Sequence, residues 1–353
     1  MTDSPFVPPV SPRPEIESLE TPPSRIPTSE TPTSENSLLD SPPLTLPSTA
    51  FSNGPTAPRP RRWTVFAVIV AGVISTMLAA GVLVGLLAVI QFGPAGAQQP
   101  GVMRKLAGTP AGFLALVVLP QFALIVPAMV AAIASPLGTR ERLGLVRGGW
   151  PIWAWLAAAM AAPVVGIVSG SVMSLVLEQS ESLKQMGDSF RAVGRGWFGW
   201  VVALAVGMVP AICEEILFRG YAQTRLVRSF PPVVGILIAS ALFAAFHLDF
   251  VHAITVFPLG VYLGVISYRS GSLFPAMMGH FLNNFISVSF MVFGMLDESG
   301  NLPDPPNPAV AASAMAVMIG GLMGVAGTIK ALWSFPPVAP ERAGSTSAAE
   351  PMA

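Results

Sequence analysis

Apolar residues along this chain fall into long runs that short polar links separate. Eight such runs follow one another, at 64–92, 108–135, 150–177, 197–220, 232–248, 252–268, 273–296 and 308–334. A helix needs about 20 apolar residues to cross the hydrocarbon core of a bilayer, and about 17 can suffice. Proline and glycine in several of the links favour breaks between helices. The pattern therefore predicts an all-α fold, a polytopic membrane helix bundle of about eight transmembrane helices.

The two ends of the chain have a different composition from the apolar runs. Residues 1–62 are rich in Pro, Ser and Thr, and such a segment cannot bury enough apolar surface to offset its chain entropy. We expect a disordered cytoplasmic tail there, with partner binding through its proline-rich stretches as the alternative. Residues 336–353 predict a second, shorter tail. Between the tails we expect N-terminal transmembrane helices at 63–148 and a core at 149–335.

Composition supports a membrane protein over a soluble one. Hydrophobic residues make up 52% of the chain and charged residues 11%, whereas soluble domains carry about 25% charged residues. Basic and acidic residues balance at 19 each, so the charge gives no indication of a nucleic-acid partner. The single cysteine, Cys213, excludes an intrachain disulfide and a thiolate metal cluster, and we interpret it as a packing residue.

Arginines in alternate links predict the orientation of the bundle in the membrane. One set of links and tails carries Arg59, Arg61, Arg62, Arg140, Arg142, Arg147, Arg225, Arg228, Arg269 and Arg342. The opposite links mix basic residues with acids. The positive-inside rule therefore predicts that both termini lie in the cytoplasm, and that the protein lies in the plasma membrane if its source is bacterial.

Three charged residues stand in the fourth apolar run, where each would cost about 3 kcal/mol near the bilayer centre. Glu215 and Arg219 are four residues apart with the acid first, the favoured order for an ion pair on one helix face. Glu214 is rotated by about 100° from Glu215 and lacks a partner on its own helix. A desolvated carboxylate without a cationic partner suits a general base, so we expect Glu214 to be the base and Glu215–Arg219 its support.

Histidine and asparagine side chains in two later runs are the candidate partners of Glu214. His247 shares a helix face with Phe243, four residues earlier, and His280 shares a face with Asn284. Alone, each has an ordinary interpretation: a structural ion pair for Glu215–Arg219, and interhelical hydrogen bonds for the histidines and Asn284. The remaining histidine, His252, lies near Asp249 and fits a turn at the membrane interface.

These groups can meet only if they lie at similar depths in the membrane. A fourth helix that ended at Arg219 would put Glu214 near its cytoplasmic end, while His247 lies about 24 Å along its own helix from Pro231. A fourth helix that continues through Arg225 toward Arg228 raises Glu214 to about 20 Å. We therefore predict that this helix extends beyond Gly220.

The three motifs together resemble those of a known family. Glu-Glu-Ile-Leu-Phe-Arg-Gly at 214–220, Phe-Ala-Ala-Phe-His at 243–247 and His-Phe-Leu-Asn-Asn at 280–284 look like the motifs of the CPBP intramembrane proteases. That family, also called Abi, includes the type II CAAX prenyl endopeptidases and bacterial proteins of the bacteriocin-immunity class. The resemblance covers roughly residues 150–335. Asn283 departs from the pattern only in adding a second amide beside Asn284.

The resemblance implies an intramembrane endopeptidase that acts on a protein or peptide substrate in the bilayer. Glu214 and His247 would activate water, and His280 and Asn284 would stabilise the oxyanion; Glu215, Arg219 and Phe243 would support them. We favour a mechanism without a cofactor, because the His-Glu-x-x-His helix of ordinary metalloproteases is missing. Zn²⁺ held by Glu214, His247 and His280 is the alternative.

Two non-proteolytic interpretations compete with this one. A membrane scaffold or immunity-type factor would use the same polar groups to hold the bundle together or to bind a partner. A proton-coupled transporter would use the intramembrane Glu and His as a relay, although no repeated halves with interrupted helices are visible in the sequence.

Overall fold

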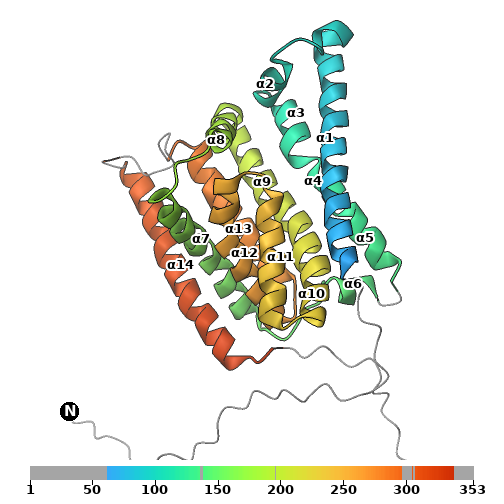
Figure 1. The fold of residues 1–353 in the computed structure, drawn as a ribbon. Coiled ribbons are helices and arrows are strands. Elements are labelled where there is room, and N and C mark those ends of the chain that lie inside the picture. Colours follow the sequence, from blue (N-terminus) through green and yellow to red (C-terminus); the bar gives the residue numbers. More distant parts are fainter. Residues whose placement is uncertain (1–61, 136–137, 195, 296–303, 305–306, 338–353) are drawn as a thin grey trace, which may run out of the picture. The chain divides into compact units, whose positions relative to one another are not determined.

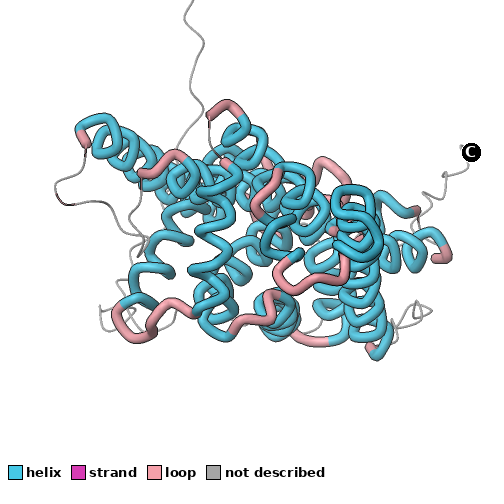
Figure 2. Tube along the Cα trace, turned by 90° about the horizontal axis from the view of Figure 1, so that it is seen from above, coloured by secondary structure: helices cyan, strands magenta, loops and turns pink. Residues whose placement is uncertain are grey.

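The computed structural model describes residues 62–135, 138–194, 196–295, 304 and 307–337. Residues 1–61 and 338–353, which hold nearly all of both predicted tails, lie outside the described residues, as do residues 296–303 and 305–306 of the acidic link. The described residues form helices and loops, and none of them lies in a strand (Figure 2). The all-α prediction is thus confirmed.

The helices follow one another along the chain as shown in Figure 1. They are α1 (Trp63–Gly96), α2 (Val102–Ala107), α3 (Pro110–Phe113), η1 (Leu114–Val118), α4 (Gln121–Leu124), α5 (Val126–Ile133), α6 (Thr139–Arg142), α7 (Ile152–Ser174), α8 (Glu181–Val193), α9 (Phe198–Glu215), η2 (Ile216–Gln223), α10 (Thr224–Ser229), α11 (Pro232–Phe246), α12 (Phe250–Ser270), α13 (Phe274–Val292) and α14 (Pro308–Ser334). The segments η1 and η2 are π-helical.

Among the described residues, six helical segments are long and apolar enough to cross a membrane. They are Trp63–Gly96, Pro110–Ile133, Ile152–Ser174, Phe198–Ser229, Phe250–Ser270 and Pro308–Ser334. The protein is therefore an integral, multi-pass membrane protein. The second of these segments is interrupted at Pro120, whose missing N–H removes one hydrogen bond from the helix.

The predicted number of eight spans is not confirmed. The fifth apolar run forms α11, which has only 15 residues and is short for a bilayer crossing. The seventh forms α13, which has 19 residues but carries His280, Asn283 and Asn284 and is not among the six segments. Helix α11 ends at its C-cap His247, and α13 carries these polar side chains within its length.

The fourth helix extends beyond Gly220, as predicted. Helix α9 continues without a break through η2 and α10 to Ser229. The π-helical turns of η2 begin directly after Glu215. Single π-helical turns within an α-helix occur frequently at functional sites, because they reorient the side chains around them.

Small residues let the helices around α7 approach closely. A Cβ on Gly324 of α14 would lie 2.6 Å from the backbone nitrogen of Ala161 in α7, and one on Gly321 would lie 2.2 Å from Val164. Across from α14, the hydroxyl of Tyr262 in α12 donates to the carbonyl of Ala158 at 2.7 Å. Close backbone contact and such bonds hold helices together where lipid removes the hydrophobic driving force.

Helix α8 was not predicted from the sequence, because its residues are too polar for a span. It lies in the link between α7 and α9, and Ser180 caps it by accepting a hydrogen bond from the Leu183 amide at 3.3 Å. Its apolar side, with Phe190 and Val193, is buried against α9 and α13.

Candidate active site

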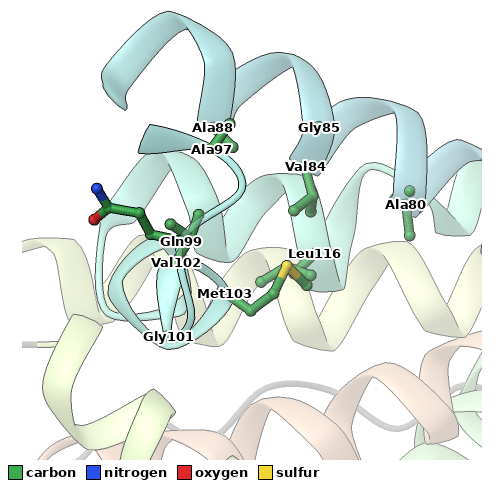
Figure 3. Close-up of a pocket in the computed structure, with 11 residues that line it drawn as sticks. Ala80, Val84, Gly85, Ala88, Ala97, Gln99, Gly101, Val102, Met103 and Leu116 are labelled. Carbon is green, nitrogen blue, oxygen red and sulfur yellow. The ribbon is translucent and has the colours of Figure 1, made fainter. Parts of the chain in front are cut away.

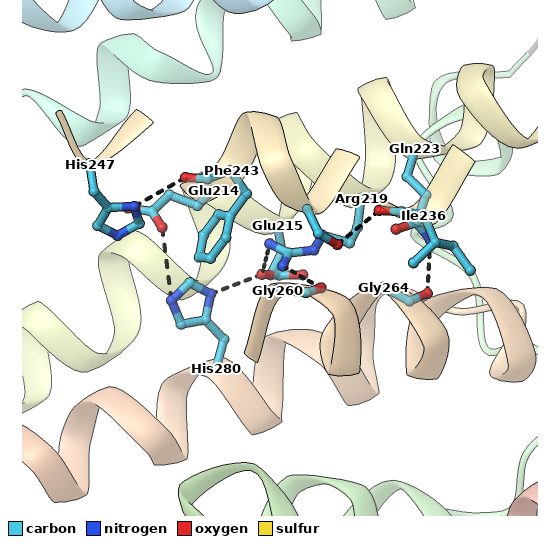
Figure 4. Close-up of polar contacts among 11 residues, drawn as sticks. Glu214, Glu215, Arg219, Gln223, Ile236, Phe243, His247, Gly260, Gly264 and His280 are labelled. Carbon is cyan, nitrogen blue, oxygen red and sulfur yellow. Dashed lines mark hydrogen bonds and ion pairs between the residues drawn. The ribbon is translucent and has the colours of Figure 1, made fainter. Parts of the chain in front are cut away.

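The acidic pair lies where α9 passes into the π-helical segment η2. Glu214 is 4% exposed and Glu215 is fully buried, while Arg219, one turn later, is 1% exposed. Figure 4 shows these side chains between α9–η2 on one side and α12 and α13 on the other. Carboxylates this deeply buried require partners, since an isolated buried charge is strongly destabilising.

Glu215 and Arg219 form the ion pair that their spacing predicts. The Arg219 Nη1 donates to Glu215 Oε1 at 2.7 Å, and both side chains are fully buried. The Arg219 Nη2 also donates to the carbonyl of Gly260 in α12 at 3.0 Å, and the guanidinium lies 4.3 Å over the Phe243 ring. This arginine therefore joins η2, α11 and α12.

His280 bridges the two carboxylates, which the sequence did not indicate. Its Nδ1 lies 2.9 Å from Glu215 Oε1, and its Nε2 lies 3.8 Å from Glu214 Oε2. The imidazole is 2% exposed. Glu215 is thus shared between Arg219 and His280, while Glu214 faces the other edge of the same ring.

His247 lies on the opposite side of Phe243 from Arg219. The Phe243 ring contacts the rings of both histidines edge-on, with centroids 5.1 Å from His247 and 5.8 Å from His280. The His247 Nδ1 lies 3.0 Å from the carbonyl of Phe243. Because a carbonyl only accepts, Nδ1 carries the proton and Nε2 of the neutral ring is left as the basic nitrogen.

The turn after His247 fixes where that histidine lies. Leu248 has φ of 56°, which is uncommon for a non-glycine residue and ends α11 at His247. The next residue, Asp249, caps α12 by accepting a hydrogen bond from the His252 amide at 2.8 Å. As a result the His252 ring lies 4.4 Å from the His247 ring, closer to the candidate site than an ordinary interfacial turn requires.

Asn284 follows His280 by one turn of α13. Its Oδ1 accepts a hydrogen bond from Asn283 Nδ2 at 3.1 Å. Asn283 itself packs against α7, where a Cβ on Gly166 would lie 2.2 Å from its Oδ1. The second amide of the motif therefore orients the first, and no acceptor for the Asn284 NH₂ group is found among the described residues.

Polar residues outside the three motifs also reach this cluster. The side chain of Gln121 in α4 interacts with Glu214. The Gln223 Nε2 donates to the Gly264 carbonyl in α12 at 2.9 Å, in the same way that Arg219 meets Gly260 one turn earlier. Gln121 is a lone polar residue in an apolar run, and this isolated position in the sequence could have identified it as a site residue.

Within the described parts of the chain, no three His, Cys, Asp or Glu side chains could hold a metal ion together. Glu214, His247 and His280 do not form such a group, although the His280 Nε2 faces Glu214 at 3.8 Å. The arrangement therefore does not fit the zinc set considered from the sequence.

A separate cavity of about 350 Å³ lies between α1 and α2 (Figure 3). Its lining is mostly alanine, glycine and valine, with Gln99, Met103 and Leu116, and includes no titratable group. None of the predicted site residues lines it. The reactive groups of the described chain are thus gathered in the buried cluster around His280, away from this cavity.

Comparison with known proteins gives one match. No curated protein and no solved structure matches the chain. The family model described as type II CAAX prenyl endopeptidase Rce1-like matches residues 196–286. This stretch contains Glu214, Glu215, Arg219, Phe243, His247, His280 and Asn284. The match confirms the resemblance that the three motifs indicate: residues 196–286 are similar to the type II CAAX prenyl endopeptidases and consistent with the CPBP family.

Proposed function

We propose that this chain is an intramembrane endopeptidase in which Glu214 and His247 activate water for attack on a peptide bond. The single observation that carries the proposal is the buried Glu214 carboxylate, which pairs with no Arg or Lys among the described residues and faces His280 within the segment matched by the protease family. The substrate is a protein or peptide presented at or within the bilayer.

In the proposed reaction Glu214 takes a proton from water while His247 Nε2 accepts a hydrogen bond from the same water. The hydroxide attacks the carbonyl carbon, and the carbonyl oxygen becomes an oxyanion. Glu214 then returns its proton to the leaving amine as the C–N bond breaks. Positioned acid–base groups of this kind contribute about 10²- to 10⁴-fold to a rate.

His280 and Asn284 are proposed as donors to the oxyanion. A His280 protonated on both nitrogens donates Nδ1–H to Glu215 and can donate Nε2–H, on the side that faces Glu214, to the oxyanion. Glu215, held by Arg219 at 2.7 Å, fixes the ring in this orientation. The NH₂ group of Asn284, whose amide oxygen accepts the bond from Asn283, supplies the second donor. Removing one such donor costs about 3–4 kcal/mol of transition-state stabilisation.

The membrane arrangement that accompanies this function is also a proposal. We place both termini in the cytoplasm and divide the chain into tails at 1–62 and 336–353, N-terminal helices at 63–148 and the protease core at 149–335.

The test compares the C-termini of membrane proteins in cells that express the wild type or Glu214→Ala. We expect C-termini that depend on the wild type and are lost in Glu214→Ala, with Glu141→Ala as the control, since Glu141 is exposed and lies outside the cluster. Both variants are also purified to check that they remain folded in detergent. A folded Glu214→Ala that still cleaves at the normal rate would contradict the proposal and favour the non-enzymatic scaffold.

A further inference from the structure

Four arginine side chains gather where α10 ends, far along the fourth span from Glu214. Arg225 is 5% exposed; its guanidinium lies 3.4 Å over the Tyr221 ring, and its Nη1 donates to the Tyr221 carbonyl at 2.8 Å. Arg228 follows one turn later and is exposed. Arg62, just before α1, donates to the carbonyl of Ser229 at 3.2 Å.

Arg142, at the end of α6, faces the same group. It lies within electrostatic range of Tyr221, Arg225 and Arg228, and its Nη1 bonds to the hydroxyl of Ser135. Its Nε is buried without a hydrogen-bond partner. Burial lowers the pKa of Arg142, and the positive charge of Arg228 lowers it further, against the opposing effect of Tyr221.

No carboxylate of the described residues balances these charges. The ion pairs formed there involve Arg191, Arg219 and His280, and none involves Arg62, Arg142, Arg225 or Arg228. The carbonyl of Ser229 at the end of α10 accounts for one donor of Arg62, and the carbonyl of Tyr221 in η2 accounts for one donor of Arg225. They do not explain why a half-buried Arg142 with an unpaired Nε is held near two other cations.

We propose that Arg142, Arg225 and Arg228 bind the phosphate group of an anionic phospholipid. Phosphate fits the planar guanidinium fork and accepts several hydrogen bonds at once. A lipid is favoured as its source by position: α10 ends the apolar segment Phe198–Ser229, and α6 lies in the link between the spans Pro110–Ile133 and Ile152–Ser174. Lipid headgroups lie at such span ends, and basic pockets between helices bind them.

The test uses the full chain in a non-ionic detergent, with three additions: phosphatidylglycerol, phosphatidylcholine with the same acyl chains, and sodium phosphate. Lipid retention is followed by native mass spectrometry, and Tm is measured in parallel. We expect phosphatidylglycerol to bind and to raise Tm, and the other two additions to do much less.

Variants distinguish a built site from general surface charge. Arg142→Gln and Arg228→Gln should each weaken phosphatidylglycerol binding roughly fivefold, and Arg140→Gln, an exposed neighbour on the same α6, should change it less than about twofold. If Arg142→Gln does not fold, the exposed Arg228 still provides the test.

Three results would overturn the proposal. Equal loss of binding in Arg140→Gln and Arg228→Gln would show diffuse attraction to the membrane surface. Equal binding of phosphatidylcholine would show that the headgroup charge is not recognised. Protection by sodium phosphate alone to the same extent would assign the cluster to a free anion and not to a lipid.

Discussion

At the scale of single residues, two adjacent glutamates have opposite surroundings. Glu215 is bonded to Arg219 at 2.7 Å and to His280 at 2.9 Å, whereas Glu214 lies 3.8 Å from His280 and no arginine pairs with it among the described residues. Adjacent helical positions differ by about 100° in direction, so neighbours in sequence face different helices. One carboxylate is therefore suited to structure and the other to chemistry.

This difference predicts opposite results for two matched substitutions. Glu215→Gln should lower the free energy of unfolding by about 3 kcal/mol or more, because it leaves the buried Arg219 charge without its partner. Glu214→Gln should leave the unfolding free energy within about 1 kcal/mol of the wild type while abolishing cleavage. Thermal unfolding in detergent and a cleavage assay measure the two effects. Equal destabilisation by both variants would show that the two carboxylates share one structural role.

The sequence could supply only part of this cluster. The spacing of Glu215 and Arg219 on one helix predicts their pairing, because residues four apart share a face. The bond from His280 to Glu215 joins positions 65 apart, and helical periodicity carries no information about which face of another helix lies opposite. The same limit explains why Gln121 was missed although it reaches Glu214.

At the scale of elements, α12 and η2 approach closely through glycines. A Cβ on Gly264 would lie 2.7 Å from Gln223 Oε1 and 2.9 Å from Ile236, and Gly260 accepts the bond from Arg219 one turn away. The extension of α9 through η2 could be predicted from the depths of the charged groups. Its π-helical form could not, because no residue pattern in 216–223 distinguishes it from an α-helix.

Substitution of Gly264 should therefore weaken the contact between α12 and η2. Gly264→Ala is expected to destabilise the protein by about 1–3 kcal/mol, because overpacking pushes η2 from α12. Gly170→Ala in α7 is the control: a Cβ there meets nothing within 4 Å, so higher helix propensity should leave stability unchanged or raised by up to about 1 kcal/mol. Tm in detergent measures both. A Gly264→Ala protein as stable as Gly170→Ala would show that the helices do not require this close contact.

The start of α8 is tied to the start of α12 through Asp249. Hydrogen bonds from Ser180 and Ser182, together with the His252 amide, lower the pKa of Asp249 from 3.8 to about 2. A carboxyl whose folded pKa is depressed stabilises the fold above its unfolded pKa and loses this effect as pH falls through the folded value. The hydrogen bonds of Asp249 that tie α8 to α12 should thus be intact at neutral pH and be lost between about pH 4 and pH 2.

Comparison of the wild type with Asp249→Asn isolates this group from other titrations. The difference in Tm should be constant above about pH 5 and shrink toward zero as pH falls from about 4 to 2. Hydrogen exchange in α8 should increase over the same range in the wild type, and be increased at every pH in the variant. A Tm difference that persists unchanged to pH 2 would contradict the depressed pKa.

At the scale of the whole molecule, the first two apolar runs share a core with the segment that the family model matches. Val65 of α1 and Leu124 of α4 are buried in one cluster with Leu217, Phe218 and Phe243. The family model begins only at residue 196, and sequence alone placed a boundary near 148. The shared cluster shows that the earlier helices cover one side of η2.

This sharing predicts that the proposed core cannot fold by itself. Removal of residues 1–148 takes away α4, whose Gln121 interacts with Glu214 and whose Leu124 packs beside Leu217. The buried acid would then face lipid, at a cost of about 3 kcal/mol, in addition to the lost packing. We expect no monodisperse protein in detergent by size-exclusion chromatography. A chain that starts at Ala57 should keep the Tm of the full chain, because residues 1–56 are rich in Pro, Ser and Thr and are expected to bury little apolar surface. A stable, active chain that starts at Gly149 would instead show that the helices before it are dispensable to the site.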